Sequence, residues 1–276
     1  MKKNTILMLG TIVLSSSLLT SPSVYVHARD VSSQMTYITN RNANHSMGDF
    51  LKGTANLRRL ETSGISAAEL GRPLKDFIDI SSNNGDISKE EFQMMKDKYG
   101  IKGVIVKLTE GSVYRNPKAP MQIANAKAAG LRVSVYHFSW FDSPEGATEE
   151  AEYFLDYAKE LNLDLNTSLV NDYESVSSPV ESDPTTNSLR FAEVLKTAGY
   201  ENVYHYSSKT WFSSILDINK LGQKNCWVAE WPINPTADNP LHTGNAAWQW
   251  ASDLYFPELG DSRHFDISTD YLNAFS

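Results

Sequence analysis

The sequence is short of cysteine and of positive charge. Its 276 residues include one cysteine, Cys226, and 25 lysines and arginines against 33 aspartates and glutamates, a formal net charge of −8. A single cysteine excludes an internal disulfide, so an ordinary hydrophobic core must stabilise the chain. The basic residues form no cluster and no stripe with aromatic residues. These absences disfavour nucleic acid and other polyanions as partners.

Several catalytic motifs are absent as well. No G-x-G-x-x-G or phosphate-binding loop follows an apolar run, which argues against an open doubly wound sheet. Neither G-x-S-x-G nor H-E-x-x-H occurs, the six histidines are scattered, and Cys226 has no sequence-level partner. Serine, zinc and thiol hydrolysis are therefore disfavoured. We expect no cofactor and no metal.

The one long apolar run lies at the N-terminus, at residues 6–19, after Lys2 and Lys3 and before a small-residue cleavage pattern ending at Ala28. This order predicts a secretory signal peptide over residues 1–28. An uncleaved membrane anchor is the alternative, but the run is shorter than the roughly 20 residues that a span needs. Cleavage would leave 23 basic and 33 acidic residues, a net charge of −10. We expect a secreted, extracellular or cell-wall-associated monomer without membrane contact after cleavage.

The rest of the chain divides near Pro73. Residues 29–72 are polar and are interpreted as an N-terminal extension, whereas residues 73–276 alternate short β-rich runs with amphipathic helical stretches. That alternation is typical of parallel strands joined by helical crossovers. Eight strands are expected, at residues 77–81, 103–108, 132–138, 168–174, 202–207, 226–231, 246–251 and 264–268.

Helix signals mark the connections in the first half of this region. They are the capping box Ser88 to Glu91, the pair Pro117 and Gly130, Pro144, and Asp183-Pro184 with Gly199. After residue 222 the connections show little helical periodicity. The pattern predicts an α/β fold, an irregular TIM-like (β/α) barrel of eight strands whose last strands have short connections and are partly antiparallel.

Polar residues recur at the carboxyl ends of the expected strands, where such a barrel builds its active site. They are Asp79, Lys107, Glu110, His137, Asp172, Glu174, Tyr206, Glu230, Trp231, Gln249 and Asp266. Packing alone would favour branched aliphatic residues in these strands. The four carboxyl groups would meet at one mouth of the barrel: Asp79, Asp172, Glu174 and Asp266. At least one of them should then hold a proton near neutral pH.

A protonated carboxyl group beside an ionised one can catalyse glycoside cleavage. Aromatic residues near the same strand ends suit the apolar faces of sugar rings, although core packing explains some of them equally well. The acids could instead bind Ca²⁺ or Mg²⁺ through their oxygens. A D-x-D-x-D-G loop, which would favour that alternative, is absent.

Seven short motifs resemble, in their order, those of the glycoside hydrolase family 25 muramidases, the cell-wall lysozymes of bacteria and their phages. The motifs are DFIDISSNNG, VIVKLTEG, VYHF, VNDYES, CWVAEW, AWQW and FDIS, spread over roughly residues 75–275. The resemblance implies an irregular barrel and cleavage of the β-1,4 bond between N-acetylmuramic acid and N-acetylglucosamine. It also implies that Glu174 is the general acid/base, Asp172 the neighbouring carboxylate, and Asp79 and Asp266 the other two acids.

The expected partner is therefore the glycan strand of bacterial peptidoglycan. Its contacts are expected at Lys107, Glu110, His137, Tyr206, Trp231 and Gln249. Trp231 departs from the tyrosine usual in the family's motif, which could alter a sugar subsite. Asp172 could attack the sugar directly or orient its 2-acetamido group, and both routes retain configuration. A catalytically silent wall-binding protein and a hydrolase of another N-acetylated glycan such as chitin are the alternatives.

Overall fold

The structure is a computed structural model that describes residues 45–48, 64–174 and 182–276. All of these residues fall within one compact unit, Tyr37–Ser276. The expected signal peptide, residues 1–28, lies outside the described residues, as does most of the expected extension. Within the described ranges, no helix is both long and apolar enough to cross a membrane.

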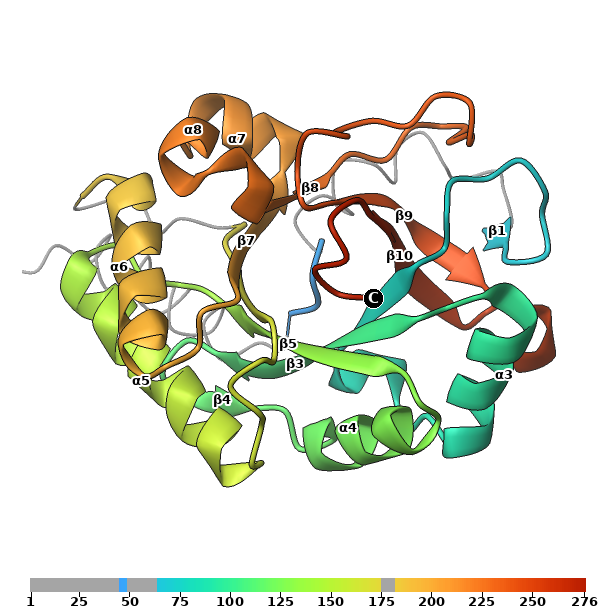
Figure 1. The fold of residues 1–276 in the computed structure, drawn as a ribbon, viewed down its shortest axis with the longest axis horizontal. Helices are drawn as coiled ribbons and strands as arrows, with labels where there is room; N and C mark the ends of the chain where they lie inside the picture. Colours follow the sequence, from blue (N-terminus) through green and yellow to red (C-terminus); the bar gives the residue numbers. More distant parts are fainter. Residues whose placement is uncertain (1–44, 49–63, 175–181) are drawn as a thin grey trace, which may run out of the picture. The chain divides into compact units, whose positions relative to one another are not determined.

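Eight strands close into a barrel, which confirms the predicted fold class (Figure 1). In order around the barrel they are β2 (Phe77–Ile80), β3 (Gly103–Glu110), β5 (Arg132–Phe138), β6 (Leu169–Asp172), β7 (Val203–Ser208), β8 (Cys226–Ala229), β9 (Ala247–Tyr255) and β10 (His264–Asp270). Neighbours from β2 to β9 are parallel. Strand β10 is antiparallel to both β9 and β2 and so closes the barrel, as expected of the last strands.

Two short strands extend this sheet. Strand β4 (Tyr114–Arg115) pairs antiparallel with β3, and β1 (Ile65–Ser66) pairs parallel with β9. Strand β1 precedes Pro73, so the part of the expected extension nearest the barrel contributes to the sheet.

Helices fill the connections of the first half and lie outside the strands in Figure 1. They are α3 (Lys89–Tyr99), α4 (Ala119–Ala128), α5 (Pro144–Glu160), α6 (Pro184–Thr197), α7 (Lys209–Ser214) and α8 (Ile218–Leu221). The Ser88 capping box starts α3 as expected. Helix α4 begins two residues after Pro117, with Pro120 in its first turn, where its missing N–H costs no hydrogen bond. Three 3₁₀ turns complete the elements: Ser82–Asn84, Gln223–Asn225 and Pro257–Leu259.

Successive strand residues alternate between two buried clusters, one inside the barrel and one beneath the helices. Phe77 and Trp227 meet inside, with ring centroids 5.1 Å apart, although their strands β2 and β8 are not neighbours. Ile78 and Val228, one residue further along each chain, belong to the other cluster. Because side chains alternate with a period of two, a polar residue an even number of positions beyond an interior residue also faces the interior.

The C-terminus closes one end of the interior. The Phe275 ring lies 4.8 Å from Tyr204 and 5.1 Å from Phe77, which are near the starts of their strands. The Asp270 carboxylate accepts hydrogen bonds from the backbone N–H groups of Ala274, Phe275 and Ser276 and so holds this segment in place. The opposite end, at the carboxyl ends of the parallel strands, carries the polar residues.

Candidate active site

Four carboxyl groups line the interior, three of them from the carboxyl ends of the parallel strands β2 and β6 and the fourth from near the amino end of the antiparallel β10. Asp172 ends β6 and lies two positions beyond the interior residue Val170, and Glu174 lies two positions further. Asp79 in β2 pairs in register with Asp266 in the antiparallel β10. All four side chains are buried. Their shared surroundings are consistent with the meeting of acids that the sequence predicts.

The pKa of the Tyr206 hydroxyl indicates that these acids lie close to one another. Its side chain is fully buried, and burial raises the pKa of its hydroxyl well above 10. Repulsion from the charges of all four carboxyl groups raises the same pKa further. One phenol on β7 therefore lies within electrostatic range of acids from β2, β10 and the end of β6.

The ionisation of Asp172 is strongly disfavoured. Burial raises its pKa well above the usual value, and Glu174 raises it further, while Lys107 opposes the shift. No hydrogen bond of ordinary geometry reaches either Asp172 carboxyl oxygen from the described residues, although Glu174 lies close enough to contribute to that shift. The pair therefore retains a proton at a pH where an exposed aspartate is ionised.

Gln249 connects three of the predicted site residues. Its Nε2 donates to Asp79 Oδ2 at 2.9 Å. Its Oε1 accepts from the Tyr206 hydroxyl at 2.7 Å and from Trp231 Nε1 at 3.0 Å. Both ends of the amide are used, so its orientation is fixed. The structure thus brings Asp79, Tyr206, Trp231 and Gln249 together.

Lys107 and Glu110 form a second buried group beside the acids. An irregularity in the pairing of β3 with β5 between Lys107 and Thr109 lets side chains three positions apart face the same interior. Lys107 Nζ lies 2.5 Å from Glu110 Oε2, and Trp140 Nε1 donates to Glu110 Oε1 at 3.0 Å. Burial raises the pKa of Glu110, but hydrogen bonds from His45 and the charge of Lys107 outweigh it, and the pKa is lowered.

The carboxylate of Glu230, one of the polar residues expected at the strand ends, contacts Lys209 and His242 and not this group. His137 is the one expected sugar contact that the structure does not bring to the group. Its neighbours Tyr136 and Phe138 face the interior, so alternation directs His137 to the helix side of β5. There Nδ1 lies 2.7 Å from Thr109 Oγ1 and Nε2 lies 2.8 Å from Glu150 Oε2. These contacts tie the barrel to α5. Glu150 itself carries no motif that would have identified it from the sequence.

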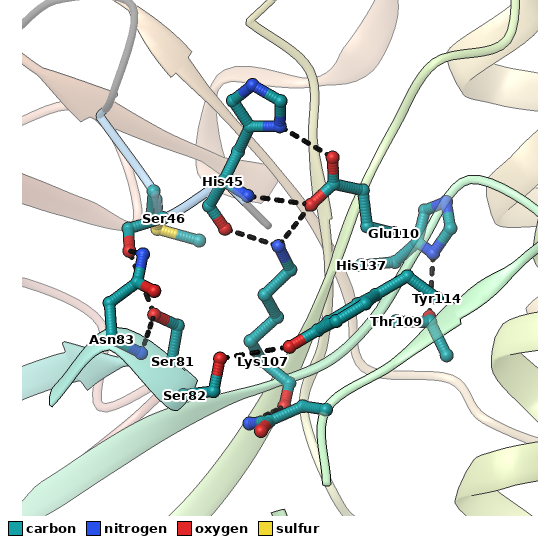
Figure 2. A network of polar contacts seen from close by, with 12 residues as sticks. His45, Ser46, Ser81, Ser82, Asn83, Lys107, Thr109, Glu110, Tyr114 and His137 are labelled. Atoms are coloured by element: carbon teal, nitrogen blue, oxygen red, sulfur yellow. Dashed lines mark hydrogen bonds and ion pairs between the residues drawn. The ribbon is translucent and has the colours of Figure 1, made fainter. Parts of the chain in front are cut away.

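A short segment that was not expected from the sequence, residues 45–48, also contacts the site. Figure 2 shows His45 beside Glu110 and Lys107, and Ser46 beside Ser81 and Asn83. The segment comes from the polar extension, where no hydrophobic period or motif indicates a contact with the barrel. No group of three His, Cys, Asp or Glu side chains suited to a metal ion occurs in the part of the chain that the structure describes.

Comparisons with known proteins agree with this geometry. The sequence model of the Glycosyl hydrolases family 25 matches residues 78–259. The lysozyme of Streptococcus phage Cp-7 is 31% identical over 189 residues, which are 65% of this chain and 51% of that protein. The chain thus spans about half the length of this relative and of the lysozyme of Streptococcus phage Cp-1.

Solved structures show the same fold. The modular autolysin LytC from Streptococcus pneumoniae, in complex with a synthetic peptidoglycan ligand, superposes with a TM-score of 0.56 at 22% identity, covering 70% of this chain and 46% of that one. The modular Cpl-1 endolysin, complexed with a peptidoglycan analogue, gives 0.53 at 25% identity, covering 71% and 54%. With the family match extending over more than half of its length, this chain belongs to family 25 of the glycosyl hydrolases.

Proposed function

We propose that the protein is a secreted lysozyme that cleaves the β-1,4 bond between N-acetylmuramic acid and N-acetylglucosamine in peptidoglycan, with retention of configuration. The observation that carries this proposal is the buried Asp172 and Glu174 pair at the end of β6, with Asp79 and Asp266 in the same interior. Relatives named lysozyme, and similar structures holding peptidoglycan ligands, support the substrate class.

In this proposal Glu174 is the proton donor and Asp172 serves the anomeric carbon. Glu174 protonates the glycosidic oxygen as the bond from that oxygen to the anomeric carbon breaks. Asp172 either bonds to the anomeric carbon itself or orients the 2-acetamido group, whose carbonyl oxygen then forms that bond. Water next attacks the same carbon as the bond from Asp172 or from the acetamido oxygen to that carbon breaks, and it gives one proton to Glu174, which restores the acid. Two displacements at one carbon retain its configuration.

The remaining polar residues would hold the sugars. Gln249 fixes Asp79, Tyr206 and Trp231, so these side chains present a stable surface to a glycan strand. Lys107 and Glu110 lie beside them. His137 makes its contacts on the helix side of β5, so we assign it to the support of the barrel wall and not to substrate contact.

The layout of the chain belongs to the same proposal. Residues 1–28 would direct export, residues 29–72 would form an extension, and residues 73–276 would form the catalytic barrel. A lysozyme must reach peptidoglycan outside the membrane, which is consistent with an exported chain. We propose that it acts as a monomer on wall glycan.

The test is release of reducing ends from purified peptidoglycan, with the new end identified by mass spectrometry. We expect N-acetylmuramic acid at the new reducing end and, by NMR, the β anomer as the first product. Release from chitin but not from peptidoglycan would favour the other N-acetylated glycan. Binding to walls without any release would identify a silent wall-binding protein and overturn the proposal.

Replacing Glu174 tests the assigned acid. Glu174→Gln keeps the size of the side chain but removes the proton, so we expect the rate of cleavage to fall by about 10²-fold or more while wall binding persists. Glu152→Gln, on the exposed surface of α5, is the matched control and should leave the rate unchanged. If Glu174→Gln kept more than about a tenth of the activity, a smaller loss than acid/base catalysis implies, another residue would be the acid.

A further inference from the structure

Residues 45–48 lie inside the mouth of the barrel, against Glu174. The backbone N–H of Gly48 donates a hydrogen bond to Glu174 Oε1. The N–H of Met47 donates to the Tyr136 hydroxyl at 3.2 Å. The Met47 side chain is fully buried and belongs to the interior cluster that contains Tyr206 and Trp227. The segment therefore reaches the acid that we assign to catalysis and fills apolar space beside it.

The other half of the segment is fixed by polar and aromatic contacts. His45 Nδ1 lies 2.6 Å from Glu110 Oε1, its N–H donates to Glu110 Oε2 at 2.9 Å, and its carbonyl accepts from Lys107 Nζ (Figure 2). Its ring stacks on Phe138, with centroids 5.1 Å apart. These contacts use Lys107 and Glu110, two of the residues that are expected to contact sugar.

Ser46 adds a contact to the loop after β2. Its Oγ lies 2.8 Å from Ser81 Oγ and accepts from Asn83 Nδ2 at 2.8 Å. Each of the four residues from His45 to Gly48 thus makes a hydrogen bond to the barrel mouth (Figure 2 shows those of His45 and Ser46). A segment that was not specifically bound would not form a hydrogen bond at each of four successive residues.

The segment and a bound glycan would compete for the same atoms. An acid catalyst must come within about 2.6–3.2 Å of the oxygen that it protonates, directly or through one water. With the segment in place, Glu174 is 3% exposed and Asp172 is 0% exposed. A Cβ built on Gly48 would lie 2.8 Å from a ring carbon of Trp231, so the segment also covers a residue expected to contact sugar.

We propose that residues 45–48 are an internal blocking segment that occupies the substrate cleft and must leave it before a glycan strand can bind. The proposal rests on the proposed lysozyme activity. A blocked form lowers the observed rate by the fraction of molecules that are closed, because only the open fraction can bind substrate. Weakening the segment's contacts should therefore raise the initial rate without changing the catalytic groups.

Two substitutions in the full chain weaken the segment in different ways. Met47→Ala removes a fully buried side chain, and we expect the initial rate on peptidoglycan to rise by about tenfold or more. Gly48→Ala places a Cβ against the Trp231 ring at a backbone φ of 76° and should also raise the rate.

Gly71→Ala is the matched control for Gly48→Ala. Gly71 has a φ of 73°, so alanine meets the same backbone strain, but no atom lies within 4 Å of the added Cβ. We expect Gly71→Ala to leave the rate unchanged. A loss of activity in both Met47→Ala and Gly48→Ala would mean that the segment helps to build the active site, and an unchanged rate in both would mean that it does not block. Either result overturns the proposal.

Hydrogen exchange separates this proposal from the lysozyme assignment, because it needs no turnover. We expect the amides of residues 45–48 to be protected in the full chain and to lose protection in Met47→Ala, whether or not the protein cleaves peptidoglycan. A soluble peptidoglycan oligomer added to Glu174→Gln should also reduce the protection. Increased protection on addition of the oligomer, or no protection in the unliganded full chain, would overturn the blocking role.

Discussion

Asp172 shows at the scale of one residue how a position proposed for catalysis can lower stability. Its pKa is raised in the folded protein, by burial first and by Glu174 next. A carboxyl group with a raised pKa binds more protons in the folded state than in the unfolded state, so the free energy of unfolding falls as pH increases above about 3.9, the usual aspartate value. The decrease in the free energy of unfolding is complete once the pH exceeds the raised pKa of the folded state.

Asp172→Asn should therefore stabilise the protein while abolishing activity. We expect its Tm to exceed that of the unsubstituted chain at pH 7 and the difference to shrink towards pH 4, because asparagine carries no charge to bury at any pH. Thermal unfolding across this range measures the effect. Asp156→Asn, at an exposed position in α5, should show no such pH dependence. If the Tm difference between Asp172→Asn and the unsubstituted chain were smaller at pH 7 than at pH 4, this account would be wrong.

The site residues that could be predicted are those carried by a motif at a strand end. Asp172, Glu174 and Asp79 follow apolar runs, and the barrel gathers such ends in one place. His137 stands at a strand end too, but its direction depends on which alternate residues face inward. The sequence RVSVYHF is apolar or aromatic on both sides, so the sequence analysis could not assign that direction. The structure resolves it through the inward Tyr136 and Phe138.

At the scale of elements, strand positions were predictable and strand ends less so. The expected strands at 103–108 and 246–251 extend in the structure to Glu110 and Tyr255. The first extension follows the irregular pairing after Lys107, which no local pattern reveals. Strand β1 was missed because two residues in a polar region give no alternation to detect, and its pairing with β9 is a long-range contact.

Helix α6, which follows strand β6 along the chain, depends on its N-terminal cap. Asp183 accepts hydrogen bonds from the N–H groups of Thr185 and Thr186, at 3.3 and 3.2 Å. Burial raises the pKa of Asp183, but the hydrogen bond from the Thr186 hydroxyl and those from the backbone outweigh it, and the pKa is lowered. A lowered pKa gives stability that is present above the unfolded value and is lost as pH falls through the folded value.

Asp183→Ala should consequently lower the free energy of unfolding by about 1 kcal/mol at pH 7, the usual cost of a lost cap. The difference should decrease when both states are protonated, near pH 2. Denaturant titration at the two pH values measures it. Asp183→Ser retains a capping oxygen and should lose much less at pH 7. Equal losses for alanine and serine would show that the cap is not what stabilises this end of α6.

At the scale of the whole molecule, the barrel is closed at one end by its own C-terminus. Phe275 is fully buried among Phe77, Tyr204 and Trp227. Gly103 permits this approach, because a Cβ there would lie 2.0 Å from the Phe275 carbonyl oxygen. The sequence analysis did not identify this packing, since Phe275 follows the last strand and lies in no periodic pattern.

Phe275→Ala should lower the free energy of unfolding by about 3–5 kcal/mol, because a large buried ring is removed from a packed interior. Leu272→Ala is the control from the same terminal segment. Leu272 is 44% exposed, and we expect a change within about 0.5 kcal/mol, as is usual for surface positions. Urea unfolding measures both. Similar losses in the two variants would mean that the segment is loosely packed.

The Trp231 indole makes the cleft observable by optical means. It donates to Gln249, lies against Gly48 and is only partly buried, whereas Trp140, which also contacts the segment through the His45 ring, is buried. An exchange of the blocking segment for a sugar ring would change the polarity around Trp231 before any bond is cleaved, and the part of the signal that Trp231→Phe removes belongs to this residue. Rapid-mixing fluorescence, compared between the full chain and Trp231→Phe, would then time the opening of the cleft separately from the chemistry.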